Sequence, residues 1–257
     1  MLRNLLSIVF LFFYFVSISQ FGNIPTKEQA LKAALSLEWL EASIAKNVVF
    51  IRLKVPYVYQ DFDEILSKSE DNIYVLNDFV KNNPALSDEV GIVQNIYNSI
   101  RLIPLSKIND KKIKNIIDLH EQFVKNNSLL ISQLMGLTEN SNINNLLYTI
   151  NFENQEFGYY FALKNSGLFF DDLGLDITQK LNQSYNKLKK SIEKLINDKN
   201  FIDSSNVIYL RQLKSDMDLI SKIIQNPSGD KFVNTIYNLI NKIRNNINYL
   251  ILNSENF

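Results

Sequence analysis

Apolar side chains recur every three or four positions through most of this chain, and this spacing limits its fold more than any other feature. The longest run starts near Leu37, Leu40 and Ile44 and continues to Val80. Such a spacing places one apolar stripe along an α-helix that packs against other helices. No segment alternates polar and apolar residues over a length that predicts a sheet. We therefore predict an all-α protein.

Few residues interrupt these helices. The 257 residues include 7 glycines and 5 prolines, fewer turn residues than a β-sandwich or an α/β fold needs. We expect antiparallel helices in two packed helical-bundle modules, residues 25–165 and residues 166–257. The first module should contain one very long helix, or two stacked end to end, that ends at Asn82. Pro56 should kink it, because proline removes a backbone donor and crowds the preceding turn.

Residues 1–20 are typical of a segment that directs export. Arg3 supplies a positive start, and the apolar run from Leu5 to Ile18 has about the length of a signal-peptide core. A full membrane span needs about 20 residues. Either a cleaved signal peptide or an N-terminal membrane anchor fits this pattern. We predict an exported protein, periplasmic or anchored to the inner membrane by this segment.

Composition argues against several classes of function. Lys+Arg and Asp+Glu both number 27, so no strong positive field favours nucleic acid. The chain has no cysteine and one histidine, which excludes thiol catalysis and every metal motif that needs two histidines. Neither a glycine-rich phosphate loop nor a nucleophile elbow is present. We therefore expect no enzyme activity, no metal and no cofactor.

His120 and Asn127 are the most informative polar residues. Both belong to an otherwise apolar stripe that includes Ile113 and Leu134. They are seven residues apart, so on a helix they leave from the same side. A buried polar group needs a hydrogen-bond partner. This pattern predicts either a polar layer with its own partners, which spacing favours, or the wall of a ligand pocket.

Arg52 and Tyr59 form a second candidate pair. They are also seven residues apart, and they flank the apolar seam of the predicted long helix. An arginine can bind a carboxylate with two parallel hydrogen bonds. From spacing alone, an arginine at the rim with its stem over the core is the more common arrangement.

The stretch from Arg52 to Phe62 resembles part of the DAHL domain, a double all-helical ligand-binding sensor domain of bacterial signalling proteins. In that family an arginine is followed seven residues later by Tyr-Asp and an apolar residue. Arg52 and Tyr59 match this pattern. Gln60 stands where the family has its aspartate, which puts that carboxylate's role in doubt.

A second stretch resembles the same family. Phe123, Asn127, Leu130 and Leu134 match its motif, whereas Val124 replaces a lysine. The family's Asn-Ser pair is replaced by the residues at positions 132–133. The motifs cover residues 36–140, and beyond them the resemblance consists of helical layout alone.

The resemblance implies an extracytoplasmic ligand-sensing module of bacterial signal transduction that lacks its own catalytic output domain. Its small-molecule ligand would contact Arg52, Tyr59 and Asn127, with His120 beside them. Any signal would pass to a membrane signalling partner protein. The alternative is an exported helical protein-interaction module with no small-molecule ligand.

Overall fold

The structure is a computed structural model, and it describes most of the chain outside the N-terminal segment. The described residues are 24–106, 108–138, 143–168, 176–198, 201, 205–226 and 229–255. The export segment 1–20 lies outside the described residues, and so do residues 169–175 near the start of the predicted second module. Within the described ranges every regular element is a helix and none is a strand, so the predicted all-α class is confirmed.

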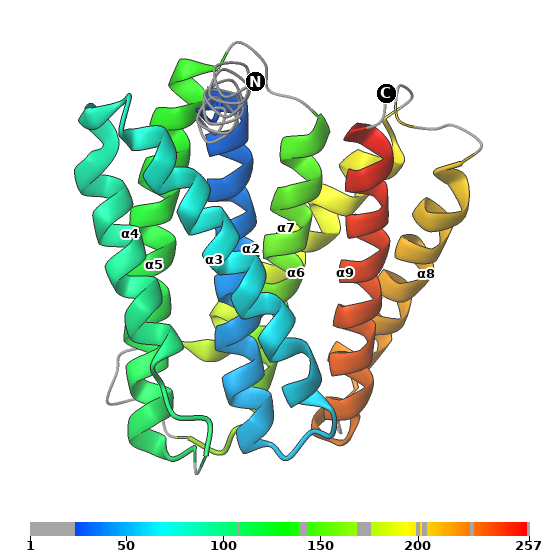
Figure 1. Cartoon of the computed structure of the whole chain (residues 1–257). Coiled ribbons are helices and arrows are strands. Elements are labelled where there is room, and N and C mark those ends of the chain that lie inside the picture. Colours follow the sequence, from blue (N-terminus) through cyan, green and yellow to red (C-terminus); the bar gives the residue numbers. More distant parts are fainter. Residues whose placement is uncertain are drawn as a thin grey trace, which may run out of the picture.

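The α-helices form one packed assembly, as Figure 1 shows. They are α2 (Lys27–Arg52), α3 (Phe62–Val80), α4 (Ser87–Arg101), α5 (Asp110–Leu137), α6 (Ile143–Lys164), α7 (Ile177–Ile196), α8 (Val207–Ile224) and α9 (Val233–Glu255). Short 3-10 turns precede α3, α4 and α9, at Val58–Asp61, Pro84–Leu86 and Gly229–Phe232. None of the described helices is long and apolar enough to cross a membrane.

Helices α2 and α6 form the centre of the fold. Every residue from Trp39 to Phe50 on α2 is buried, and so is every residue from Glu153 to Leu163 on α6. The two helices run parallel, because they touch at Lys46 beside Gly158 and again at their C-terminal ends. A helix that is covered on all sides is expected to be apolar throughout. Both central helices depart from that expectation.

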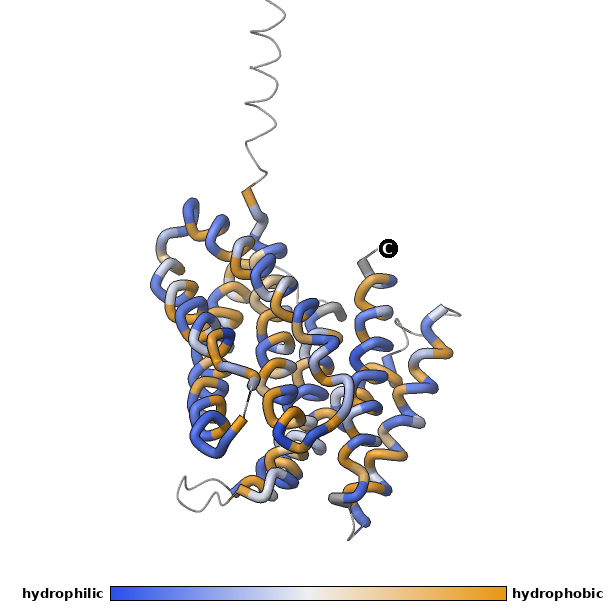
Figure 2. The backbone as a smooth tube through the Cα atoms, turned by 60° about the horizontal axis from the view of Figure 1, so that its bottom comes forward, coloured by the Kyte–Doolittle hydropathy of each residue, from blue (hydrophilic) through white to orange (hydrophobic). Residues whose placement is uncertain are grey.

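The outer helices lie on either side of this central pair. On one side α2 packs against α3 and α5, and α4 packs against α5. On the other side α6 packs against α7 and α9, and α9 packs against α8. In Figure 2, hydrophobic and hydrophilic residues alternate along the outer helices, as expected for helices with one buried side. The core is continuous across residue 165, and the division into 25–165 and 166–257 stays a prediction about chain organisation.

The prediction of one very long helix, or of two stacked end to end, kinked at Pro56 is wrong. Helix α2 ends at Arg52, and the chain turns back so that α3 runs antiparallel to α2 (Figure 1). Lys54 adopts a left-handed conformation with φ 58°, and the amide of Val55 donates to the carbonyl of Phe50. These are the marks of a Schellman helix end, which a proline commonly follows. Pro56 therefore comes after the end of a helix and does not kink one.

The glycine within α6 has a packing role. Gly158 lies in the interior of α6, although glycine is a poor helix former. A Cβ at this position would lie 2.5 Å from the Cδ1 atom of Ile240 and 3.0 Å from the Cδ atom of Lys46. The missing side chain thus allows α2, α6 and α9 to approach one another closely.

Candidate functional site

The polar residues of the central helices draw attention because they are buried among apolar neighbours. On α2 they include Glu41, Lys46 and Asn47, each 0% exposed. On α6 they include Asn154 and Gln155, also fully buried. Burying a polar group without a hydrogen bond costs about 1–3 kcal/mol. A concentration of such groups at one helix interface therefore marks the first place to look for a function.

Glu41 and His120 form the centre of this region. The Nδ1 atom of His120 lies 2.7 Å from the Oε2 atom of Glu41, and both side chains are buried. Burial lowers the pKa of His120, but the charge and hydrogen bond of Glu41 outweigh it and raise that pKa overall. Burial raises the pKa of Glu41 against the pull of His120. The two groups are therefore coupled, and their protons belong to the pair rather than to either residue.

Tyr159 covers this pair from α6. Its ring centroid lies 4.6 Å from that of His120, and Tyr160 packs against Tyr159 at 5.2 Å. Burial raises the pKa of the Tyr159 hydroxyl well above its ordinary value. That hydroxyl is fully buried and has no hydrogen-bond partner among the described residues. It is a donor and acceptor left free at the centre of the protein.

Glu38, Glu156 and Glu121 also interact electrostatically with the same imidazole, and the first two are buried or partly buried. Glu38, one turn before Glu41 on α2, accepts a hydrogen bond of 3.1 Å from the Ser128 hydroxyl. Burial, helped by the charges of Glu156 and Glu41, raises the pKa of Glu38 to about 7 although Ser128 and His120 lower it. Glu156 also acts on His120, and its Oε2 atom is buried without a partner in the described part of the chain.

We call Glu38, Glu41, His120, Glu156 and Tyr159 the acid cluster. It joins three helices, α2, α5 and α6, that the sequence separates widely. It reaches solvent on the side of Glu38, which is partly exposed, and of Ser128, which is exposed. The cluster couples one carboxyl group to His120 by contact and two by electrostatic interaction, in a largely water-free environment where such interactions are strong.

Asn127 lies on the same face of α5 as His120, as the spacing predicts. It is 0% exposed, and its Nδ2 atom donates a hydrogen bond of 2.9 Å to the carbonyl oxygen of Ala34. Its Oδ1 atom has no partner among the described residues. Half of the Asn127 amide is therefore engaged in packing between α5 and α2, and the other half is a buried acceptor without a donor in the described part of the chain.

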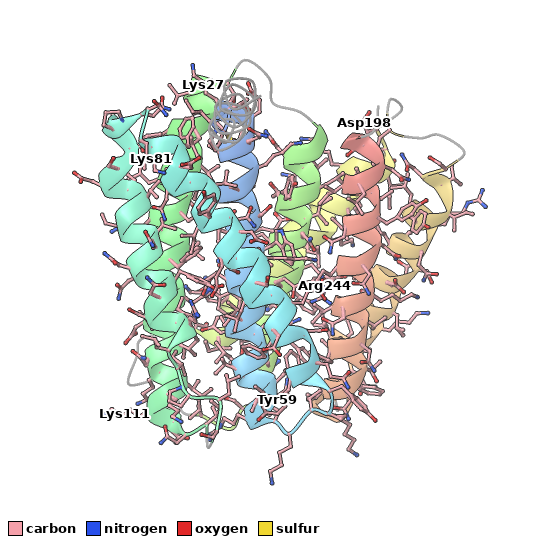
Figure 3. The ribbon with its side chains drawn as sticks, in the orientation of Figure 1. Lys27, Tyr59, Lys81, Lys111, Asp198 and Arg244 are labelled. Atoms are coloured by element: carbon pink, nitrogen blue, oxygen red, sulfur yellow. The ribbon has the colours of Figure 1, made fainter. Side chains whose placement is uncertain are left out.

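Arg52 and Tyr59 do not join the acid cluster. Arg52 pairs with Asp110, the first residue of α5, at 2.7 Å and donates to the carbonyl oxygen of Ser166 at 3.3 Å. His120 lies ten residues further along α5, about 15 Å along the helix axis. Tyr59 stands in the turn before α3 and is 55% exposed at one end of the bundle (Figure 3). The four predicted ligand-binding residues therefore fall into two separate places.

A second polar group surrounds Lys46, toward α9. The Lys46 Nζ atom is 3.1 Å from Oδ1 of Asn241 and 5.2 Å from the Tyr237 ring centroid. Burial and the positive charge of Arg244 lower the pKa of Lys46 well below its ordinary value. Arg244 itself pairs with Asp61 at 3.5 Å. This group ties α2 and α9 together.

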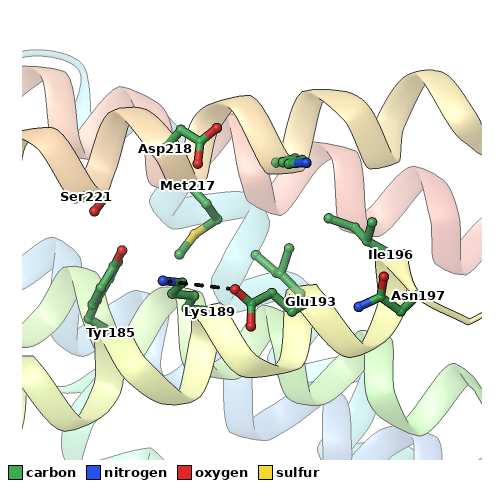
Figure 4. A pocket seen from close by; sticks show the side chains of 10 residues that line it. Tyr185, Lys189, Glu193, Ile196, Asn197, Met217, Asp218 and Ser221 are labelled. Atoms are coloured by element: carbon green, nitrogen blue, oxygen red, sulfur yellow. Dashed lines mark ion pairs between the residues drawn. The ribbon is translucent and has the colours of Figure 1, made fainter.

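A cleft of about 320 Å³ lies between α7 and α8, and Figure 4 shows it. Its floor includes the buried side chains of Ile192 and Met217. Its rim carries charges of both signs, and Lys189 lies 4.0 Å from Glu193 within it. None of the residues singled out from the sequence lines this cleft. A balanced, solvent-exposed rim is weaker evidence for a ligand than buried polar atoms without partners.

Glu41, Glu156 and Lys46 were missed by reasoning from the sequence. Glu41 and Lys46 could have been found from one pattern in the sequence. The stretch around Ala42 and Ala45 has apolar residues on every side of the helix. A helix of that kind is buried all round, so any charged residue within it is buried as well.

The comparisons with known proteins add nothing to this geometry. No group of three or more His, Cys, Asp or Glu side chains in the described ranges could hold a metal ion. No known protein family, curated protein or solved structure matches this chain. The relation to DAHL domains stays a prediction from the two motifs.

Proposed function

We propose that this protein is a ligand-sensing helical module that binds a small polar molecule at the acid cluster. The observation that carries this proposal is the set of buried polar atoms without partners around the Glu41–His120 pair. They are Oε1 of Glu41, Nε2 of His120, Oε2 of Glu156 and the Tyr159 hydroxyl. A ligand with complementary groups would remove their desolvation cost, so the free protein is prepared for binding.

The resemblance to DAHL domains supplies the setting of this proposal. In that setting the module lies outside the cytoplasm and has no catalytic output of its own. A membrane signalling partner would read the ligand-bound state. Because the acid cluster joins α2, α5 and α6, a ligand bound there would favour one arrangement of these helices over another.

A thermal-shift screen of the purified chain tests the proposal. The panel contains amino acids, organic acids, nucleobases and amines. A ligand at a hundredfold excess over its dissociation constant stabilises the folded state by about 2.7 kcal/mol. We expect an upward shift with one class, and we expect Asn127→Leu to abolish it while the helical circular dichroism stays intact.

Tyr59→Leu is the matched control, because Tyr59 is exposed at one end of the bundle, whereas Asn127 is buried on the face of α5 that also carries His120. It should leave the ligand-induced shift unchanged. Loss of the shift in Tyr59→Leu but not in Asn127→Leu would move the site to the other end of the bundle. No shift with any compound in the panel would contradict the proposed function.

The alternative, an exported protein-interaction module, has support from another surface. Ile208 and Leu219 on α8 and Tyr249 on α9 are large apolar side chains with exposures of 70%, 42% and 40%. Exposed apolar surface of this kind favours a protein partner. Self-association in solution that Ile208→Ser abolishes would favour this alternative.

A further inference from the structure

The cleft between α7 and α8 carries four charged side chains. Lys189 and Glu193 stand on α7, and Lys214 and Asp218 stand on α8. All four are exposed. The two charges on each helix are four residues apart, about one turn, so they leave the helix on the same side. Each wall of the cleft therefore presents one positive and one negative charge along its length.

The two walls differ in how their charges are paired. On α7 the Nζ atom of Lys189 lies 4.0 Å from Oε1 of Glu193, and Figure 4 marks this ion pair. On α8 the side chains of Lys214 and Asp218 form no hydrogen bond or ion pair with any residue that the structure describes. Helix α8 thus offers a free cation and a free anion one turn apart.

Such a wall is complementary to a second copy of itself. If two copies face each other about a two-fold axis that crosses α8 midway between Lys214 and Asp218, the two α8 helices run antiparallel. Residue 214 of each copy then lies opposite residue 218 of the other. Lys214 meets Asp218 of the partner subunit, and the symmetry produces this contact twice.

The same axis also suits the charges on α7. Tyr185 and Ser221 lie opposite each other at one end of the cleft, as Figure 4 shows. The midpoint of the α8 charges is five residues from Ser221, and the midpoint of the α7 charges is six residues from Tyr185. The two midpoints therefore lie within about 1.5 Å along the helices. One axis can bring Lys189 opposite Glu193 of the partner subunit as well.

The cleft also has apolar surface that a second copy would cover. Ile192 and Met217 lie at its floor, and Ile196 beside them is half-buried. Two helix pairs that pack face to face form a four-helix bundle, in which such residues face the centre. The formal net charge of the chain is zero, so no overall repulsion opposes self-association.

We infer that the cleft between α7 and α8 is a homodimer interface, in which the α8 helices of two copies pack antiparallel and Lys214 pairs with Asp218 of the partner subunit. This inference concerns assembly, goes beyond the proposed function and does not depend on the acid cluster. The cleft follows α7 from Tyr185 to Asn197, about 18 Å of helix. A contact of this length belongs to the weak, reversible class of interfaces.

Sedimentation velocity of the full chain, from about 5 to about 500 µM, tests the inference in the range of weak interfaces. We expect a reversible equilibrium between monomer and dimer. Lys214→Glu and Asp218→Lys should each weaken the dimer at least tenfold, because both α8 contacts then join like charges. An equimolar mixture of the two variants should dimerise again, because every α8 contact between them joins opposite charges. Unchanged helical circular dichroism shows that each variant is folded.

Lys68→Glu is the matched control, because it reverses one exposed lysine that pairs with Glu64 on α3, outside the cleft. It should leave dimerisation unchanged. Monomers at every concentration, equal losses in Lys68→Glu and Lys214→Glu, or a variant mixture that stays monomeric would each overturn the inference. So would a dimer that Ile208→Ser abolishes and Lys214→Glu leaves intact, since Ile208 is 70% exposed and does not line the cleft.

Discussion

Glu38→Gln should make the stability of this protein less dependent on pH. Burial raises the pKa of Glu38 from an ordinary value of 4.5 to about 7 in the folded chain. Between these values the folded state holds more protons than the unfolded state, so stability is highest below pH 4.5 and falls as pH rises through 7. Glutamine resembles the protonated carboxyl group and can still accept the hydrogen bond from Ser128.

The size of the effect follows from the two pKa values. Between pH 5 and pH 8 a group that shifts from 4.5 to about 7 costs about 2.5 kcal/mol of folding free energy. Partial exposure of Glu38 to solvent screens this cost, and we expect about 1–2.5 kcal/mol. Urea titrations of both proteins at pH 5 and pH 8 measure it. The stability of Glu38→Gln minus that of the wild type should be larger at pH 8 than at pH 5 by this amount.

Glu64→Gln provides the comparison for that experiment. Its hydrogen bond to Lys68 lowers the pKa of Glu64, so its titration lies below pH 4.5, outside the range studied. The stability difference between this variant and the wild type should be the same at pH 5 and pH 8. If the stability difference between Glu38→Gln and the wild type is also the same at both pH values, the pKa of Glu38 is not raised by burial. The acid cluster as described would then be wrong.

Two further predictions concern the frame around the site. Lys54→Gly should raise the free energy of unfolding by about 1 kcal/mol, because glycine adopts the left-handed conformation of Lys54 without steric cost; an unchanged urea midpoint would contradict the Schellman end of α2. Gly158→Ala should lower stability by about 1 kcal/mol, because overpacking against Ile240 exceeds the gain in helix propensity. The same substitution in an Ile240→Val background, where the Cδ1 atom is gone, should be neutral or stabilising, and equal losses in both backgrounds would refute the close contact.

Local patterns in the sequence predicted the helix that carries His120 and Asn127. The Asn109 side chain caps α5 by accepting a hydrogen bond from the amide of Lys112. His120 and Asn127 lie on the buried face of this helix. These features depend on neighbours within a few turns, which a linear pattern reveals. The partner of His120 is 79 residues away, and no local pattern connects the two. For this reason the polar face could be predicted and Glu41 could not.

The end of α2 shows a different limit. Apolar spacing continues without interruption from Val48 through Val55 to Phe62, so it predicts one helix. Lys54 and Tyr57 adopt left-handed conformations, which are most common for glycine. The identity of these two residues therefore does not predict a turn here. The chain therefore reverses where periodicity alone predicts a kink. Because of that reversal, Arg52 and Tyr59 do not share one helix face, which is what their spacing predicts.

The parallel pairing of α2 and α6 also determines when the core can form. The hydrogen bond from Arg52 to Ser166 joins residues 114 positions apart. Contacts this distant in sequence slow folding relative to most helical proteins, because a long loop must close first. At a synthesis rate of about 5–20 residues per second, α2 waits on the order of ten seconds for α6. During that interval the apolar sides of α2 that α6 will cover remain open to chaperones and to other nascent chains.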